Sequence, residues 1–459
     1  MKPTYETSAA TEGTASPTTA SAVTLTLKSP QLWVLTGLIL GIAAGAQTIG
    51  PVVIPLGAAA VTLLPMIWGL IAGTAVSGQK IKPVPVDLQR AATVIMGLAV
   101  LVLCARLSFT IGPNIPLLLD AGPALLLQEL GHLFGTIALA LPLAVLLRMG
   151  PATVGATFSI DRESSFAMVS ERYGSDSPQY RGVLSMYIFG TIFGAVIVSL
   201  IASLCVSMGI FDPIALAMGS GVGSGSMMAA AAGVIVAAHP EMQEQVLAVA
   251  ATSNLITSVL GLYIGVWVSL PLADKAYKLL TRNADAKLPG AAKLDEQELA
   301  ATRATAAVLL EAPKVKVGLW TSLAIIGTAG VIVTTIAVKG FLWEMIATYA
   351  LLSLLTVLGV AAARATKGKL PAIIVVITLG ALATSPISPL ATWIVGAAES
   401  VNFLSVITVM LTIAGLSLGK DLPMLKSIGW RIIPVGMVAI IASFLLATII
   451  AEFALGLWH

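Results

Sequence analysis

The stretch MGSGVGSGS at residues 218–226 decides the fold, because it interrupts a long apolar segment at 213–238. Each glycine in a helix interior costs roughly 1 kcal/mol relative to alanine, so this run of glycines predicts that the helix stops here. Backbone groups left unpaired in lipid are costly, and a break at membrane depth must therefore be buried in protein or line a wet cavity. The sequence predicts an unwound tip within a membrane-embedded segment.

Two interpretations of this tip remain open. Its free N–H groups, its serine hydroxyls and the N-terminus of the following helix suit an anionic group. Small residues also let helices pack closely without any ligand. A dinucleotide-binding loop is excluded, because no strand precedes the glycines. Under the first interpretation the substrate-binding residues are Gly219, Ser220, Gly221, Gly223, Ser224, Gly225 and Ser226.

The composition of the whole chain indicates a polytopic membrane protein. Charged residues make up 10% of the 459 residues, hydrophobic residues make up 57%, and the mean hydropathy is +0.97. Soluble domains carry about 25% charged residues, so an ordinary cytosolic enzyme is excluded. The net charge of +3 is too small to indicate a nucleic-acid partner, and the two cysteines and three histidines predict neither a disulfide framework nor a metal site. No catalytic motif occurs, so we expect neither an enzyme nor a cofactor.

Runs of about 20 apolar residues, each long enough to cross a bilayer, recur along the chain. They predict an all-α membrane protein with about ten transmembrane helices. The predicted spans are 31–49, 51–77, 91–112, 124–148, 183–208, 244–271, 317–338, 341–363, 402–418 and 432–456. Two further apolar stretches, 213–238 and 371–398, are interrupted by Gly, Ser or Pro, and we expect discontinuous or re-entrant segments there.

The chain divides at its longest polar loop. Residues 1–30 are rich in Ser and Thr and are expected to form a disordered tail. Residues 31–271 form an N-terminal membrane half, 272–316 a cytoplasmic linker, and 317–459 a C-terminal membrane half. The matched interruptions in the two halves suggest an inverted repeat.

The basic residues of the loops predict the orientation, because short basic loops favour the cytoplasm. The loop with Lys80, Lys82 and Arg90 and the basic linker 272–316 both belong inside, which also places the N-terminus in the cytoplasm. Both loops lie on the cytoplasmic side only if 213–238 enters and leaves the membrane on the outer side as a hairpin, because a full crossing there would place the linker outside. For 371–398 the same rule favours a broken helix that crosses, whereas the repeat favours a second hairpin.

The second interruption is TSPISP at 384–389, where two prolines free backbone carbonyls that can coordinate a cation. A simple kink satisfied by neighbouring helices is the alternative. Ser385 and Ser388 are the candidate binding residues of this segment.

Ionisable and polar residues within the spans are candidates for ion coupling. Glu129 and His132 share a helix face and predict either a proton relay or an interfacial anchor. Ser253 and Asn254 could bind Na⁺ or hold helices together. In the polar cluster after Gly155, the alternatives are an interfacial ion-pair loop or a pathway. In a pathway, Asp161 would couple an ion and Arg162 would contact substrate or a gating carboxylate.

The glycine-serine tip followed by Met and small residues resembles that of bacterial carriers of the 2-hydroxycarboxylate (citrate-type) family and of the related glutamate:sodium symporters. The resemblance covers mainly residues 211–260. It implies two inverted five-helix repeats, re-entrant hairpins and an elevator-like moving domain, with the glycines and serines of 219–226 at a hairpin tip. The tip here reads GSGVGSGS instead of the paired GGxG pattern of those families, and prolines stand where they have a second glycine-rich tip.

We therefore expect a secondary active transporter of a small polar or anionic organic solute, such as an organic acid or amino acid, driven by Na⁺ or H⁺. A domain containing 213–238 and 371–398 would move against uninterrupted helices. The alternatives are a passive channel and a membrane scaffold of the envelope. The partners are the solute and the bilayer of a bacterial inner membrane, and we expect a homodimer.

Overall fold

The computed structural model describes residues 23–56, 59–160, 164–174, 177–281, 315–367, 370–420 and 429–458, together with positions 300 and 422. The fold is all-α apart from four short strands. The first helices are α1 (Pro30–Ile49), α2 (Pro65–Gly78), α3 (Val86–Ile111), α4 (Ile115–Asp120), α5 (Gly122–Gly135), α6 (Leu141–Leu146), α7 (Ala152–Thr157), α8 (Ser164–Tyr173), α9 (Pro178–Met208) and α10 (Pro213–Gly219). They are followed by α11 (Gly225–Ala238), α12 (Gln243–Ile264), α13 (Leu270–Thr281), α15 (Leu319–Val338), α16 (Trp343–Ala365), α17 (Ala372–Thr384), α18 (Ala391–Glu399), α19 (Phe403–Leu418) and α21 (Ile432–Trp458).

Seven helices within the described residues are long and apolar enough to cross a membrane, or eight if the bent pair α18–α19 counts as one span. They are Pro30–Ile49, Val86–Ile111, Gly122–Leu146, Pro178–Met208, Leu319–Val338, Trp343–Ala365 and Ile432–Gly456. The protein is therefore a multi-span membrane protein, with fewer such helices than the ten expected. The predicted span 402–418 is α19, which bends by 66° from α18.

The prediction of a single helical span over 51–77 is wrong. Residues Val52–Leu56 (β2) and Ala59–Leu63 (β3) form an antiparallel strand pair, and only α2 is helical. Gly50, with φ of 74°, ends α1, and the following Pro51 cannot continue a helix. The β-branched residues 52–54 favour strands, and Pro65 starts α2 at a position where its missing N–H costs nothing. Hydropathy alone does not distinguish a single helical span from a strand pair followed by a short helix.

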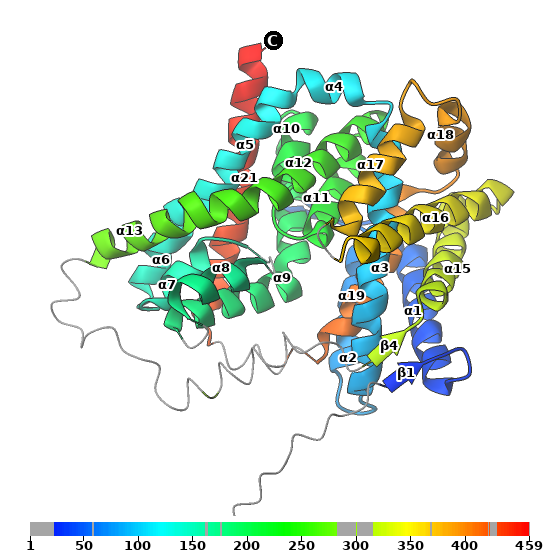
Figure 1. The fold of residues 1–459 in the computed structure, drawn as a ribbon, viewed down its shortest axis with the longest axis horizontal. Coiled ribbons are helices and arrows are strands. Elements are labelled where there is room, and N and C mark those ends of the chain that lie inside the picture. The colour runs from blue at the N-terminus through cyan, green and yellow to red at the C-terminus, as the bar shows by residue number, and fades with distance from the viewer. Residues whose placement is uncertain are drawn as a thin grey trace, which may run out of the picture.

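Two strands far apart in the chain tie the start of α1 to the start of α15. Residues Val23–Leu25 (β1) pair in parallel with Val315–Val317 (β4). The helices α1 and α15, which follow these strands, pack against each other. The chain segments before the two helices therefore lie at the same end of the molecule (Figure 1), in agreement with the parity expected from the charges. Residues 1–22, 282–299 and 301–314, which make up most of the predicted tail and linker, lie outside the described residues.

The segment 213–238 turns back on itself. It consists of α10 and α11, and the predicted interruption is confirmed at residues 220–224. The N–H of Asp212, before α10, donates to Glu452 near the end of α21, whereas Gly219, at the end of α10, lies against Thr448 one turn earlier in α21. After α11 the chain returns to that same end, where α12 begins (Figure 1).

The second predicted interruption is also confirmed, since helix α17 ends at Thr384 and α18 begins at Ala391. Most of the connecting residues lie at the surface, with Ile387 85% exposed, whereas Ser385 is buried. The helix α17 packs against α3 and α16.

The helices form two bundles. The hairpin bundle comprises α5 to α13 together with α21, and the flanking bundle comprises α1 to α3 together with α15 to α19 (Figure 1). The last helix of the chain thus belongs to the bundle of the N-terminal half, and the first three helices belong to the bundle of the C-terminal half. The two interrupted segments lie in different bundles, which differs from the expected single moving domain.

Pairs of glycines four residues apart bring the central helices close in each bundle. In the flanking bundle, a Cβ added at Gly73 would lie 2.7 Å from Thr412 O and 2.9 Å from Leu416 N of α19. In the hairpin bundle, a Cβ added at Gly131 would lie 2.6 Å from Leu446 C of α21, and one at Gly135 would lie 2.7 Å from Ala442 O. The backbones therefore touch at these positions.

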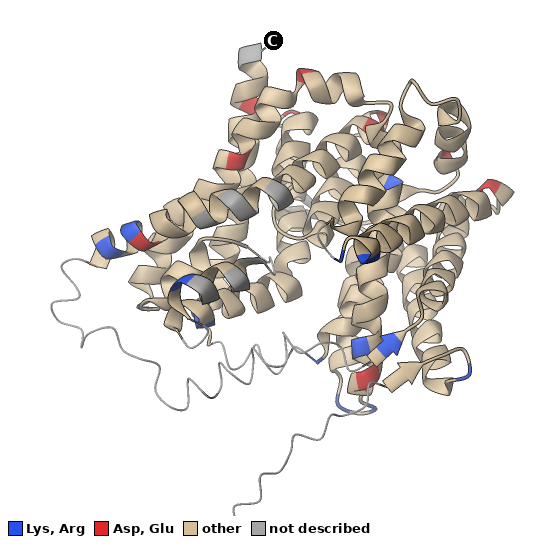
Figure 2. Ribbon diagram, viewed as in Figure 1, with Lys and Arg blue, Asp and Glu red and all other residues tan. Residues whose placement is uncertain are grey.

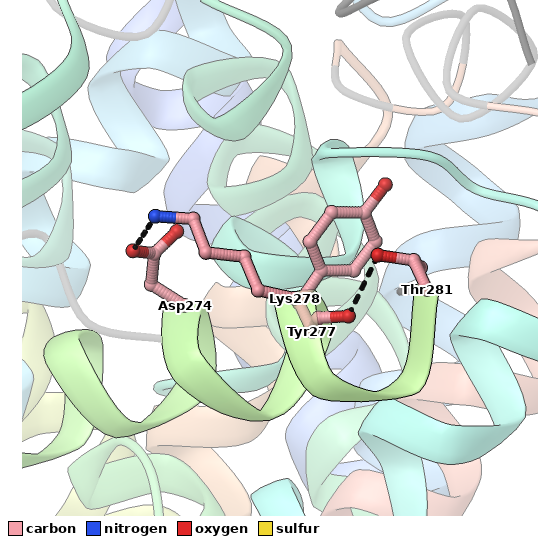
Figure 3. Close-up of polar contacts among 4 residues, drawn as sticks. All are labelled: Asp274, Tyr277, Lys278 and Thr281. Atoms are coloured by element: carbon pink, nitrogen blue, oxygen red, sulfur yellow. Dashed lines mark hydrogen bonds and ion pairs between the residues drawn. The ribbon is translucent and has the colours of Figure 1, made fainter. Parts of the chain in front are cut away.

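Charges separate along the long axis of the helices. Figure 2 shows Asp and Glu gathered near the end where α4 and the C-terminus lie, while Lys and Arg lie mostly at the other end and along α13. Figure 3 shows the C-terminal part of α13, where Lys278 Nζ lies 2.7 Å from Asp274 Oδ2 and the Thr281 hydroxyl donates to Tyr277 O. The exposed Leu279 and the basic residues of α13 suit a helix at a membrane surface.

Candidate functional site

A pocket lies at the hairpin tip, inside the hairpin bundle. The cavity has a volume of about 50 Å³ and is partly open to solvent. The polar lining comes from α5, α12, α21 and the segment after α7, and the tip itself contributes Val222 and Gly223. The lining residues are Glu129, His132, Leu133, Thr136, Phe158, Ser159, Ile160, Met168, Val222, Gly223, Thr257, Gly261, Gly265 and Ser443.

Glu129 brings a carboxylate into the pocket from α5 and is 5% exposed. Its Oε1 accepts a hydrogen bond from Gln128 Nε2 at 2.7 Å and another from the hydroxyl of Thr257 on α12. Charged groups within membrane helices are rare and point to function. Burial beside the pocket favours the coupling interpretation of Glu129 over that of an interfacial anchor.

His132 lies one turn after Glu129 and links α5 to α21. Its Nδ1 is 3.3 Å from Ser443 Oγ, and the Ser443 hydroxyl also lies 3.2 Å from His132 O. The spacing of i and i+3 places both ionisable side chains on one helix face, as the sequence predicts, and this face lines the pocket.

The hairpin tip is fastened to α12 by two polar side chains. The Ser253 hydroxyl donates to Met218 O at 2.7 Å, and Asn254 Nδ2 donates to Gly221 O at 2.9 Å and to Gly223 O at 3.3 Å. The Gly221 and Gly223 carbonyls lie beyond the end of α10, whereas Met218 O also accepts from the backbone N–H of Gly221 at 3.1 Å. Ser253 and Asn254, candidates for ion coupling from the sequence, thus hold the tip in place.

Asn254→Ala should destabilise the protein by about 1–3 kcal/mol, because it leaves two buried carbonyls without their donor. The measurement is thermal unfolding of the purified protein in detergent. Thr252→Val on the same helix is the matched control, since the Thr252 hydroxyl has no hydrogen-bond partner within the described residues. Equal unfolding temperatures for the two variants would contradict the anchoring role.

Glycines at the tip make close contacts possible. A Cβ added at Gly221 would lie 2.8 Å from Ser253 Cβ and 2.9 Å from Asn254 N. Gly223 has φ of 67°, a conformation that other residues rarely adopt. The glycines therefore allow close packing on α12, and Gly223 brings the backbone to the pocket wall. Binding of an anionic group at the tip stays a prediction.

Two π-helical turns border the pocket. One, Thr136–Ala140, continues α5, and the other, Gly265–Ser269, continues α12. The first residue of each turn, Thr136 and Gly265, lines the pocket. Such turns occur frequently at functional sites in helices, since they displace side chains from regular helical positions.

The structure brings together only part of the predicted site. Gly223, Glu129 and His132 line one pocket, and Gly219, Ser220 and Gly221 pack the tip against its neighbours. Ser224 and Ser226 lie at the start of α11, where their hydroxyls are 3.2 Å apart, and Gly225 faces Val100.

Ser385 and Ser388 do not line the pocket. The Ser385 hydroxyl donates to Leu382 O, and Ser388 Oγ accepts from the N–H of Leu390. Their part in binding stays a prediction. Asp161 and Arg162 lie outside the described residues, directly after Ile160 of the pocket wall.

The sequence interpretation missed several lining residues. Ser443 is separated from the tip by two hundred residues of chain, and its polar hydroxyl within the apolar run of α21 was the only local signal. Thr257, one turn after Ser253, belongs to the polar face of α12 that the sequence had indicated. Each π-helical turn ends two residues before a proline, Pro142 or Pro271, whose missing N–H interrupts the helical hydrogen bonds, and the sequence interpretation missed this signal.

These features define an integral membrane protein with an intramembrane polar pocket. The chain belongs to the family described as "Protein of unknown function (DUF3100)", which matches residues 44–279, just over half of the chain. All pocket-lining residues except Ser443 lie within the matched region. No curated protein and no solved structure matches the chain. The resemblance to citrate-type carriers stays a prediction.

Proposed function

We propose that the protein is a secondary active transporter of a small polar or anionic organic solute, coupled to Na⁺ or H⁺ and working by alternating access. The observation that carries the proposal is the pocket shared by the interrupted tip, at Val222 and Gly223, and the buried Glu129 and His132. Transporters commonly bind their substrates at discontinuous helices near the middle of the membrane.

The chemistry of the pocket supports a small polar solute. Hydroxyls of Ser159, Thr257 and Ser443, each hydrogen-bonded within the protein, line the wall next to the apolar side chains of Phe158 and Met168. A mainly apolar wall with a few placed polar groups is typical of small-molecule sites.

The two-bundle arrangement supports movement. In the proposal, segment 213–238 is a re-entrant hairpin, and the hairpin bundle moves against the flanking bundle. A small hydrophobic cluster that includes Phe158, Tyr180 and Leu270 lies within the hairpin bundle. The main hydrophobic core continues from α9 to α12 and α21 into the flanking bundle. The charge separation along the helices supports a cytoplasmic N-terminus.

The test is a ligand screen by thermal unfolding of the purified protein against organic acids and amino acids, with and without Na⁺. A bound solute at about 100 times its Kd should stabilise the protein by about 2.7 kcal/mol and raise the unfolding temperature. Ser443→Ala in the pocket should reduce this shift, whereas Ser385→Ala, outside the pocket, should leave it unchanged. A ligand shift abolished by Ser385→Ala and kept by Ser443→Ala would contradict the proposed site.

A further inference from the structure

We infer that the coupling ion is H⁺, taken up by Glu129, and that the hydroxyl of Thr257 relays the charge state of Glu129 to the hairpin tip. The inference rests on the proposed function and names the ion that drives it. It is carried by a hydrogen-bond chain from α5 through α12 to the tip.

The hydroxyl of Thr257 has two acceptors in reach. One is Glu129 Oε1, and the other is the carbonyl oxygen of Ser253, at 2.9 Å. A threonine hydroxyl carries a single proton, so it donates to only one of them at a time. Whether the Thr257 hydroxyl donates to Glu129 or to Ser253 O therefore depends on whether the Glu129 carboxyl group is ionised or protonated.

The protonation state of Glu129 sets the direction of this hydroxyl. An ionised carboxylate only accepts, so Thr257 then donates to Glu129. A protonated carboxyl group donates to Thr257 Oγ1, and the Thr257 hydroxyl is released to donate to Ser253 O. The proton forms an O–H bond with a Glu129 carboxylate oxygen and neutralises the negative charge of that group. No other covalent bond forms or breaks.

The chain continues directly to the tip. Ser253, whose carbonyl receives the released hydroxyl, donates through its own side chain to Met218 O. The next residue, Asn254, donates to Gly221 O and Gly223 O. The turn of α12 that responds to Glu129 is thus the turn that holds the tip, and Gly223 of that tip lines the same pocket. A substrate in the pocket and a proton on Glu129 therefore both act on the hairpin tip.

Among the described residues, Glu129 and His132 are the ionisable side chains of the pocket wall. The elements packed on α5 also carry Asp120 on α4, Asp212 before α10, Glu244 on α12 and Glu452 on α21. None of these four lines the pocket. Proton relays in membrane proteins use such buried Glu and His side chains.

Infrared difference spectroscopy between acidic and alkaline buffer tests the protonation step on the full chain in liposomes. The wild-type protein should show the carbonyl band of a protonated carboxyl group, and Glu129→Gln should lose it. Thr257→Val should shift this band, because the hydroxyl partner is gone, and Thr257→Ser should restore it. Glu244→Gln, which removes an exposed carboxyl group from α12, should keep the band. A band that persists in Glu129→Gln would overturn the inference.

Maleimide labelling of Ser226→Cys tests the link to the tip. Labelling rates are compared across pH with Glu129 present and with Glu129→Gln, so that the titration of the cysteine itself cancels in the ratio. The ratio should change with pH by more than about threefold for Ser226→Cys and stay constant for Ser388→Cys on the other interrupted segment. A constant ratio at both positions would overturn the relay.

The two proposals fail in different ways. A Glu129 band and a pH-dependent tip support the relay even where proteoliposomes move no solute, and the transporter assignment then falls alone. If the wild-type protein and Glu129→Gln transport the solute equally well, the relay is overturned and the transporter assignment stands.

Discussion

Replacing Gly221 with leucine should abolish solute uptake while the protein still inserts into the membrane. The new side chain would meet Ser253 Cβ at 2.8 Å and the backbone N of Asn254 at 2.9 Å, so the tip has to leave α12. Overpacking of this kind costs about 1–3 kcal/mol, which is smaller than the stability of a folded domain. The protein should therefore remain folded with a displaced tip. Gly223→Leu should have the same effect, because Gly223 has φ of 67° and leucine is strained there.

The matched control is Gly225→Ala. Gly225 belongs to the same glycine run, but the nearest atom to an added Cβ is Val100 Cγ1 at 3.7 Å, an ordinary contact. Uptake should stay within about twofold of the wild-type rate for this variant, a change of under ~0.5 kcal/mol. The measurement is uptake of the solute from the ligand screen, together with protein content of the membrane fraction. Full transport by Gly221→Leu would contradict the tip assignment.

Gly131→Leu should have the largest effect on folding. The added Cβ would lie 2.6 Å from Leu446 C, so α5 and α21 would have to separate along their whole contact. Because the neighbour is backbone, no side chain can rotate away. We expect loss of the folded protein, measured as aggregation during size-exclusion chromatography in detergent. Gly73→Leu should do the same to α2 and α19.

Gly41→Leu on α1 is the control for these two variants, since nothing lies within 4 Å of a Cβ added there. Leucine also favours the helix over glycine by roughly 1 kcal/mol. The control should therefore elute as the wild-type protein does. A folded, monodisperse Gly131→Leu would show that α5 and α21 do not pack closely in the membrane.

Local chemistry accounts for the features that were predictable from the sequence. Both interruptions were predicted correctly, because glycine at 219–225 and proline at 386 and 389 act on the backbone where they stand. The shared helix face of Glu129 and His132 followed from helical spacing alone, whereas the pocket that this face lines did not.

Features that depend on distant partners were not predictable. Hydropathy favours a helix over 51–77, whereas the β-branched residues 52–54 pair with a second strand. The packing of α21 against α5 brings Ser443 to His132, and no local pattern encodes that pairing.

The most direct test of the account is counterflow of the identified solute in proteoliposomes. Vesicles loaded with unlabelled solute should accumulate labelled solute transiently and with saturation. An alternating-access carrier exchanges a solute molecule inside the vesicle for one outside. Gly221→Leu should lose this accumulation and Gly225→Ala should keep it. An ohmic single-channel current, or the absence of any counterflow for a solute that binds the pocket, would contradict the assignment as a transporter.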